Sequence, residues 1–225
     1  MKRLILIGDS VLKGIVFSSG KYKTLENDNR FAPLSEMGVE TVNLSKMGAT
    51  ALKIKRTVDS LETLDGDTAV LFSFGGNDSN YKWDEVSLRP EEAHAPFVEA
   101  KDYLRIYGEC VDEVRKKGAC EVYVTNLIPI EQHKFFNSIC KGNDAESILK
   151  WLGDENMLYR WHESYSRLAE RLAYEKKCSF VDLRSPLLLT HKYSDLMCED
   201  GIHPTREGYR LIGETLCGAL CRRPS

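Results

Sequence analysis

Leu4-Ile5-Leu6-Ile7 runs directly into Gly8-Asp9-Ser10 near the start of this 225-residue chain. A continuous apolar run that is this short and ends at a glycine is typical of a strand buried in a parallel sheet. In open α/β sheets, ligands bind beyond the carboxyl ends of the strands. The stretch therefore predicts a central strand that carries Ser10 to the edge of a ligand-binding crevice.

Two roles are open to Ser10 on this stretch alone. A serine at a strand end can act as a nucleophile where a base lies nearby. Serine is also a preferred N-cap, so Ser10 could simply begin the next helix. Because capping serines are common, the rest of the chain has to decide between the two roles.

The alternation of strand and helix continues along the chain. Five strands separated by helices are typical of a parallel sheet that is covered on both faces. We expect an α/β fold with a flavodoxin-like five-stranded parallel sheet in the order 2-1-3-4-5, in a single domain over residues 1–225. The expected strands span 4–7, 39–44, 69–74, 121–125 and 179–183. Apolar periodicity predicts helices at about 49–61, 99–117 and 154–177, and a closing helix that contains Tyr209 and Leu220.

Three segments depart from this alternation. A short helical stretch is predicted after Ser10 to about residue 20, followed by a polar loop over 21–30. Residues 79–96 are irregular. Residues 126–153 form a long connection, and connections of this length in compact domains tend to be functional or partly helical lids.

Composition indicates an ordinary globular protein, with 42% hydrophobic and 29% charged residues. The net charge of -3 provides no basic field for nucleic acid, and Arg222 and Arg223 are expected to complement the end of the last helix. No run of about 18 apolar residues is present, and the first apolar run is too short for a secretory leader. We expect a cytoplasmic protein with a small-molecule substrate and no membrane span; the sequence does not indicate an oligomeric state.

Cofactor and metal motifs are missing from the sequence. The seven cysteines contain no C-x-x-C pair and are typical of reduced, mostly buried thiols. Cys217 and Cys221 share a helix face, but no further ligand stands at metal-binding spacing beside them. Neither a P-loop ending nor G-x-G-x-x-G is present. We therefore expect no metal and no cofactor.

A late loop offers a base for a nucleophilic serine. Asp200 lies three residues before His203 in a loop bounded by Gly201 and Pro204. This spacing lets the carboxylate reach the imidazole Nδ1 and leaves Nε2 for the serine. Taken alone, an Asp-x-x-His loop is more often solvated surface.

An acyl-transfer serine also needs hydrogen-bond donors for the oxyanion. The backbone of Gly48 and the side chain of Asn77 are candidates, since both follow predicted strands. Taken singly, Gly48 is better explained as a helix start and Asn77 as a turn residue.

The order of these motifs is more specific than any one of them. Gly8-Asp9-Ser10, Gly48, Gly75-Gly76-Asn77-Asp78 and Asp200-Gly201-Ile202-His203-Pro204 follow one another, each at an element boundary. Over essentially the whole chain, this set resembles the SGNH hydrolase family, also called the GDSL-type esterases and lipases. The chain departs from the family pattern at Val11, where leucine is usual, and by lacking a glycine before Gly48 in its block.

The resemblance implies a three-layer α/β/α sandwich and a role for each motif. Ser10 is the expected nucleophile, His203 the base and Asp200 its partner. The Ser10 N–H, the Gly48 N–H and the Asn77 side chain form the expected oxyanion hole.

The remaining candidates are judged by their position. Aromatic residues in the two irregular segments are open to a role in a substrate pocket, namely Tyr81, Trp83, Phe135 and Phe136. Trp161 and Tyr165 share a helical stripe, so we expect them in the core. The other histidines lack paired spacing, and we expect surface or structural roles for His94, His133, His162 and His191.

These observations predict a metal-independent serine ester hydrolase that works through an acyl-enzyme on Ser10. No long apolar flap is evident, so a small acyl group such as acetyl on a carbohydrate is expected rather than a long-chain lipid. Acyl transfer to a sugar or other alcohol would use the same residues. A non-catalytic binding module on a flavodoxin-like sheet is the alternative from another class, and a serine inert to active-site probes would indicate it.

Overall fold

The computed structural model describes residues 1–221, so Arg222 and Arg223 lie outside the described residues. Its strands form a parallel sheet that comprises β1 (Arg3–Gly8), β4 (Glu40–Asn43), β5 (Thr68–Ser73), β6 (Glu121–Thr125) and β7 (Ser179–Val181). The strand order β4-β1-β5-β6-β7 confirms the predicted 2-1-3-4-5 arrangement. The missing numbers belong to two strands of a separate hairpin, which is described below.

The first strand lies inside the sheet, between β4 and β5, and its side chains alternate between two cores. Ile5 pairs with Val42 on one side and with Val70 on the other. Ile5 and Ile7 pack into one hydrophobic cluster, whereas Leu4 and Leu6 pack into a second. Because successive side chains of a strand point to opposite faces, a strand covered on both faces has to be continuously apolar.

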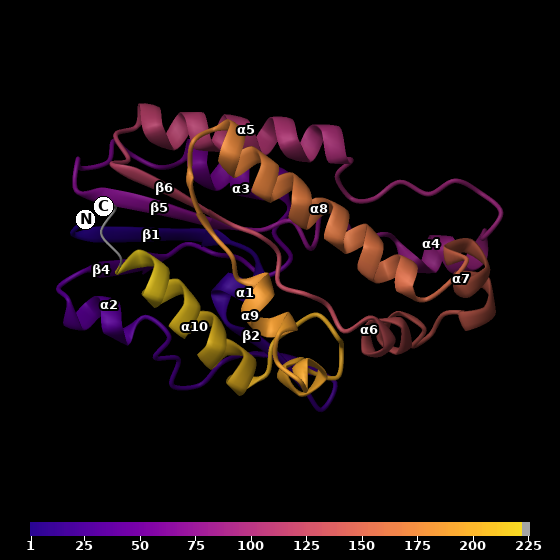
Figure 1. Cartoon of the computed structure of the whole chain (residues 1–225). Helices are drawn as coiled ribbons and strands as arrows, with labels where there is room; N and C mark the ends of the chain where they lie inside the picture. The colour runs from indigo at the N-terminus through magenta and orange to yellow at the C-terminus, as the bar shows by residue number, and fades with distance from the viewer. Residues whose placement is uncertain (222–225) are drawn as a thin grey trace.

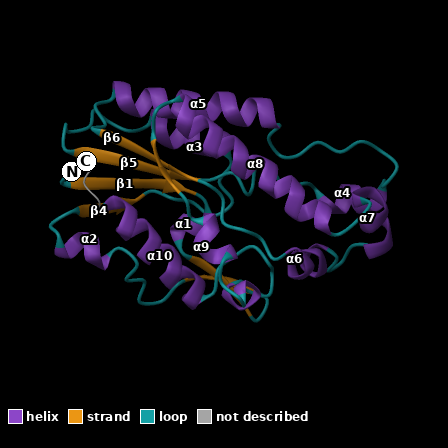
Figure 2. Ribbon diagram, in the orientation of Figure 1, coloured by secondary structure: helices purple, strands orange, loops and turns teal. Residues whose placement is uncertain are grey.

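Helices cover both faces of the sheet (Figures 1 and 2). The face with Ile5 is covered by α3 (Ala51–Asp59), α5 (Ala100–Lys116) and α8 (Asn156–Glu175). The opposite face is covered by α2 (Ala32–Glu36), α9 (Arg184–Leu188) and α10 (Arg206–Leu220). The expected three-layer α/β/α sandwich is therefore confirmed.

A further group of helices lies beyond the carboxyl ends of the strands, at the right of Figure 1. It consists of α4 (Trp83–Leu88), α6 (Gln132–Ile139) and α7 (Ala145–Leu152). Together with the start of α8, these helices form a third hydrophobic cluster, which we call the cap cluster: Tyr81, Trp83, Val86, Ile130, Ile139, Ile148, Leu152 and Leu158. The long connection over 126–153 is thus partly helical, as predicted, and the segment predicted to be irregular contains α4.

The prediction for residues 11–30 was wrong over 14–24, whereas 25–30 form a loop as predicted. The helix α1 (Ser10–Lys13) spans only four residues, because Gly14 adopts a left-handed conformation with φ of 85° that ends it. An antiparallel hairpin of β2 (Ile15–Ser18) and β3 (Lys21–Thr24) follows. Ser19 and Gly20 form its turn, both with positive φ, which suits the twist of a tight hairpin.

Three further observations complete the fold. A short 3-10 helix, η1 (Tyr193–Leu196), lies between α9 and α10. All seven cysteines are free, as expected. Three of them are buried, namely Cys110, Cys198 and Cys217, whereas most were expected to be buried. Within residues 1–221, no helix combines the length and the apolar character that crossing a membrane requires.

Candidate active site

Ser10 and His203 form a hydrogen bond although they come from opposite ends of the chain. The distance between Ser10 Oγ and His203 Nε2 is 2.8 Å. Asp9, and not Ser10, caps α1, since its carboxylate accepts the Val11 N–H at 3.0 Å. The capping role that the sequence left open to Ser10 therefore belongs to its neighbour, and the serine hydroxyl faces the imidazole.

Asp200 holds the other side of the imidazole. Its Oδ2 lies 2.5 Å from His203 Nδ1, and its Oδ1 accepts the backbone N–H of Ile202 and of His203. Both side chains are buried. A carboxylate only accepts hydrogen bonds, so Nδ1 carries the proton and Nε2 presents its lone pair to Ser10. This is the orientation that a general base for a serine requires.

Gly201 makes the close turn between the two residues of this pair possible. It adopts a φ of 73°, which favours glycine. A side chain at this position would lie 2.4 Å from the backbone nitrogen of Phe135 on α6. The loop with Asp200 and His203 is therefore packed directly against the cap helices.

The hairpin places an aromatic ring beside the candidate base. The Tyr22 ring lies edge-on to His203, with 5.2 Å between the ring centroids. Burial and the nearby Asp200 raise the pKa of Tyr22. Sequence reasoning missed this residue because its strand was predicted to be a polar loop.

Two donors of the expected oxyanion hole belong to residues that line the same cavity. Ser10 is the first residue of α1, so its N–H has no acceptor within the helix. Asn77 lines the same cavity as Ser10, and its side-chain amide donates to the Ala49 carbonyl at 3.1 Å. An amide nitrogen carries two hydrogens, so one remains for a ligand.

Gly48 occupies a turn beside the end of β1. The Lys46 N–H donates to the Gly8 carbonyl at 3.0 Å, and the Ala49 N–H closes the turn on Lys46. Gly48 has a φ of 64°, but it is not among the described residues that line the cavity beside Ser10. Its role in an oxyanion hole stays a prediction.

Asp78 connects the two segments that carry the expected oxyanion donors Gly48 and Asn77, a role that sequence reasoning missed. Its Oδ1 accepts the Ala51 N–H at 2.7 Å, at the start of α3, where Thr50 provides no side-chain cap. Burial, together with the nearby Asp9 carboxylate, raises the pKa of Asp78 to about 7. Asp78 therefore ties the turn with Gly48 to the segment with Asn77.

A cavity of about 100 Å³ lies beside Ser10, between the sheet edge and the cap cluster. Of the four aromatic residues expected in a substrate pocket, Tyr81, Trp83 and Phe135 line this cavity, whereas Phe136 packs against the cap cluster. Trp161 lines it as well, contrary to the expectation of a purely core position, and Tyr165 is in the core as predicted.

His162 also lines the cavity. It is 8% exposed, and burial together with the charge of Arg184 lowers its pKa to about 3. The imidazole is therefore neutral at physiological pH. Its Nδ1 has no hydrogen-bond partner among the described residues.

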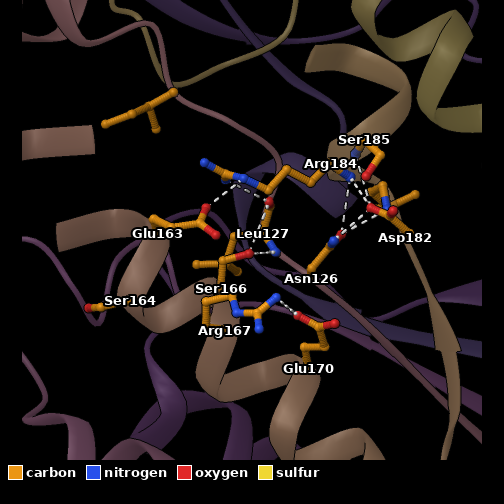
Figure 3. Close-up of polar contacts among 12 residues, drawn as sticks. Asn126, Leu127, Glu163, Ser164, Ser166, Arg167, Glu170, Asp182, Arg184 and Ser185 are labelled. Atoms are coloured by element: carbon orange, nitrogen blue, oxygen red, sulfur yellow. Dashed lines mark hydrogen bonds and ion pairs between the residues drawn. The ribbon is translucent and has the colours of Figure 1, made fainter. Parts of the chain in front are cut away.

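A buried arginine secures one wall of the cavity. Arg184 forms a 2.6 Å ion pair with Glu163 of α8 and donates to the Leu127 carbonyl at 3.2 Å. Figure 3 shows the guanidinium pointing toward both groups, and the Asn126 amide pointing toward Asp182. Leu127 lines the cavity, so this network fixes the wall after β6 to α8 and α9.

Comparison with known proteins adds a family and a set of similar folds. The model of the GDSL-like lipase/acylhydrolase family matches residues 6–211. Among curated proteins, no sequence matches. The lipase/acylhydrolase from Enterococcus faecalis is 14% identical, with a TM-score of 0.66 over 98% of this chain and 95% of that chain. An acetylxylan esterase from Geobacillus stearothermophilus is 19% identical, with a TM-score of 0.68 over 99% and 95%.

Proposed function

The chain belongs to the GDSL-like lipase/acylhydrolase family and is an ester hydrolase; on this premise, we propose that Ser10 is its nucleophile and that the reaction passes through an acyl-enzyme. The 2.8 Å hydrogen bond between Ser10 Oγ and His203 Nε2 carries the proposal. A serine hydroxyl is a weak nucleophile unless an adjacent base takes its proton.

In the first half of the reaction, Ser10 Oγ attacks the ester carbonyl carbon while His203 Nε2 takes the hydroxyl proton. The negative charge of Asp200 stabilises the imidazolium that forms. The Ser10 N–H and the Asn77 amide donate to the developing oxyanion, with Gly48 as the third proposed donor. The tetrahedral intermediate then collapses, His203 returns the proton to the leaving alkoxide, and the alcohol departs.

In the second half, water replaces the alcohol. His203 takes a proton from the water as its oxygen attacks the acyl carbon of the acyl-enzyme. Collapse of the second tetrahedral intermediate breaks the bond to Ser10 Oγ, which recovers its proton from His203. The products are the carboxylic acid and the free enzyme.

The substrate we propose carries a short acyl group, such as acetyl on a carbohydrate. A cavity of about 150 Å³ holds one benzene molecule. The cavity beside Ser10 measures about 100 Å³, so it has room for a few carbon atoms rather than a long chain. The acetylxylan esterase with a similar fold is consistent with such a substrate.

A fluorophosphonate probe tests the nucleophile directly, because it labels only activated serines. We expect the wild-type protein to be labelled and Ser10→Ala to be unlabelled. Ser35→Ala, which changes an exposed serine on α2, is the matched control and should be labelled like the wild type. Equal labelling of the wild type and Ser10→Ala would refute the assignment.

A further inference from the structure

His162 is a polar side chain in the cavity wall that the proposed catalytic steps do not use. It belongs to α8 and is more than nine-tenths buried. Its Nδ1 is itself buried and has no hydrogen-bond partner among residues 1–221. Burying an imidazole without partners costs free energy, and a ligand can supply a hydrogen bond only at the other ring nitrogen, Nε2.

The second ring nitrogen of His162, Nε2, faces a small space beside Gly76. A methyl group at Gly76 would lie 3.7 Å from His162 Nε2 and 3.9 Å from Asp9 Oδ2. The two polar atoms therefore border one space from two sides. Asp9, Gly76 and His162 all line the cavity beside Ser10, and the other carboxylate oxygen of Asp9 is already engaged by the Val11 N–H.

The protonation states of these groups select the kind of ligand. Burial raises the pKa of Asp9 to about 6, so at pH 7.5 the side chain is mainly a carboxylate, which only accepts hydrogen bonds. The neutral imidazole of His162 can donate from one ring nitrogen. A hydroxyl group has one donor and two acceptor positions, so it can accept from Nε2 and donate to Oδ2 at once. A ligand carboxylate would be repelled by Asp9, and an alkyl group would offer neither atom a hydrogen bond.

We propose that His162 and Asp9 form a subsite for a hydroxyl group of the ester substrate, so that the enzyme selects hydroxylated esters over alkyl analogues of the same size. This inference rests on the proposed esterase function and names its substrate class. The hydroxyl can belong to the acyl part or to the alcohol part of the ester. His162 is in this view a specificity residue, which contacts substrate but takes no part in proton transfer.

Two pairs of isosteric esters separate these sources. In the acyl pair, p-nitrophenyl 3-hydroxypropanoate is compared with p-nitrophenyl butyrate. In the alcohol pair, 2-hydroxyethyl acetate is compared with propyl acetate. For each pair, the ratio of kcat/KM is divided by the ratio of the rates of hydroxide-catalysed hydrolysis, which removes the difference in intrinsic reactivity. We expect the wild type to favour the hydroxylated ester at least about tenfold in one pair.

Two variants approach the subsite from opposite sides. His162→Leu removes the donor, and Gly76→Ala fills the space without a severe clash, because both polar atoms lie at ordinary contact distance from the added methyl group. Each should bring the selectivity ratio close to one. His191→Leu, at an exposed histidine, is the control and should keep the wild-type ratio.

A wild-type ratio near one in both pairs would overturn the inference, as would a preference that persists in both variants. Hydrolysis of the alkyl esters distinguishes this failure from that of the proposed function. If the wild type hydrolyses the alkyl esters but ignores the hydroxyl, the esterase function stands and only the subsite is refuted. If it hydrolyses none of the four esters, both fail.

Discussion

Asp200 contacts three hydrogen-bond donors, and only one of them is the imidazole of His203. Oδ1 accepts two backbone N–H groups of its own loop, while Oδ2 faces Nδ1. The loop conformation and the orientation of the imidazole therefore depend on different oxygens of one carboxylate. A substitution that changes only the second oxygen can separate the two roles.

Asp200→Asn is such a substitution. Its amide oxygen can still accept the two backbone donors, but its NH₂ group would face Nδ1, which then has to accept. The imidazole proton moves to Nε2, where it opposes proton abstraction from Ser10. We expect kcat to fall by about 10³–10⁴-fold, measured on p-nitrophenyl acetate, with an unchanged melting temperature. Glu199→Gln, at the exposed neighbour of Asp200, should keep wild-type activity. A tenfold loss or less would show that Asp200 does not orient the base.

At the scale of the elements, the N-terminus of α3 is capped by a residue that is distant in the sequence. Its N-terminal N–H at Ala51 is satisfied by Asp78, which follows β5, and not by the preceding Thr50. The start of a helix and the segment with Asn77 are therefore joined by one buried carboxyl group. Desolvation makes the ionised form of this group costly, although the positive end of the helix dipole partly offsets the cost.

This cost makes stability depend on pH in a predictable direction. The pKa of Asp78 rises from 3.8 to about 7 on folding. Between these values the native state holds a proton that the unfolded state releases, so the free energy of unfolding falls as the pH rises. Asp78→Asn keeps an acceptor for Ala51 but cannot ionise. Relative to this variant, we expect the wild type to lose on the order of 4 kcal/mol between pH 4 and pH 7, measured by urea unfolding.

The comparison between the two proteins measures Asp78 together with its coupling to the neighbouring Asp9. Asp9 and His162 also titrate between pH 3 and pH 7 in the native or unfolded state, but both remain in the variant. Asp84→Asn, at an exposed residue of α4, is the matched control and is measured over the same pH range. If the difference between wild type and Asp78→Asn does not change with pH, Asp78 does not hold a proton in the native state.

How well an element could be predicted depends on how it is buried. The strand around Leu4–Ile7 is covered on both faces, and a continuous apolar run reports such burial directly. In contrast, all four residues of β3 are exposed, so the strand lacks the alternation that marks a half-buried one. Tyr22 was consequently missed, although its ring lies beside His203.

At the scale of the whole molecule, α8 connects two hydrophobic clusters. Its Leu158 belongs to the cap cluster, whereas Tyr165 and Leu172 pack against the sheet. Trp161 and His162 lie between these regions, where the helix passes the cavity. Apolar periodicity predicts which side of a helix faces inward, but it does not reveal whether protein or a cavity lies opposite. The places of Trp161 and His162 in the cavity wall could therefore not be predicted from the sequence, because they depend on how the cap cluster packs against the sheet.

The same packing sets the size of the cavity that we propose holds the acyl group. Trp151 of α7 lines the cavity, and its ring packs against Tyr81 and Trp83 with centroid distances of 4.9 Å and 6.2 Å. The cap cluster thereby closes the end of a cavity of about 100 Å³. For the wild type, we expect kcat/KM in a series of p-nitrophenyl esters to be highest for acyl groups of two to about four carbons and to fall for longer chains.

Trp151→Ala should lengthen the preferred acyl chain, because it removes an indole ring from the cavity wall. We expect the ratio of kcat/KM for p-nitrophenyl octanoate to kcat/KM for p-nitrophenyl acetate to rise at least about tenfold. The free energy of unfolding should fall by about 3 kcal/mol. Leu149→Ala, at an exposed position of the same helix, should leave the chain-length profile unchanged. A wild-type profile in Trp151→Ala would mean that the acyl group does not enter this cavity. Ser10 would then receive its substrate from the side of the Tyr22 hairpin, and the aromatic wall of the cap would serve the alcohol part of the ester.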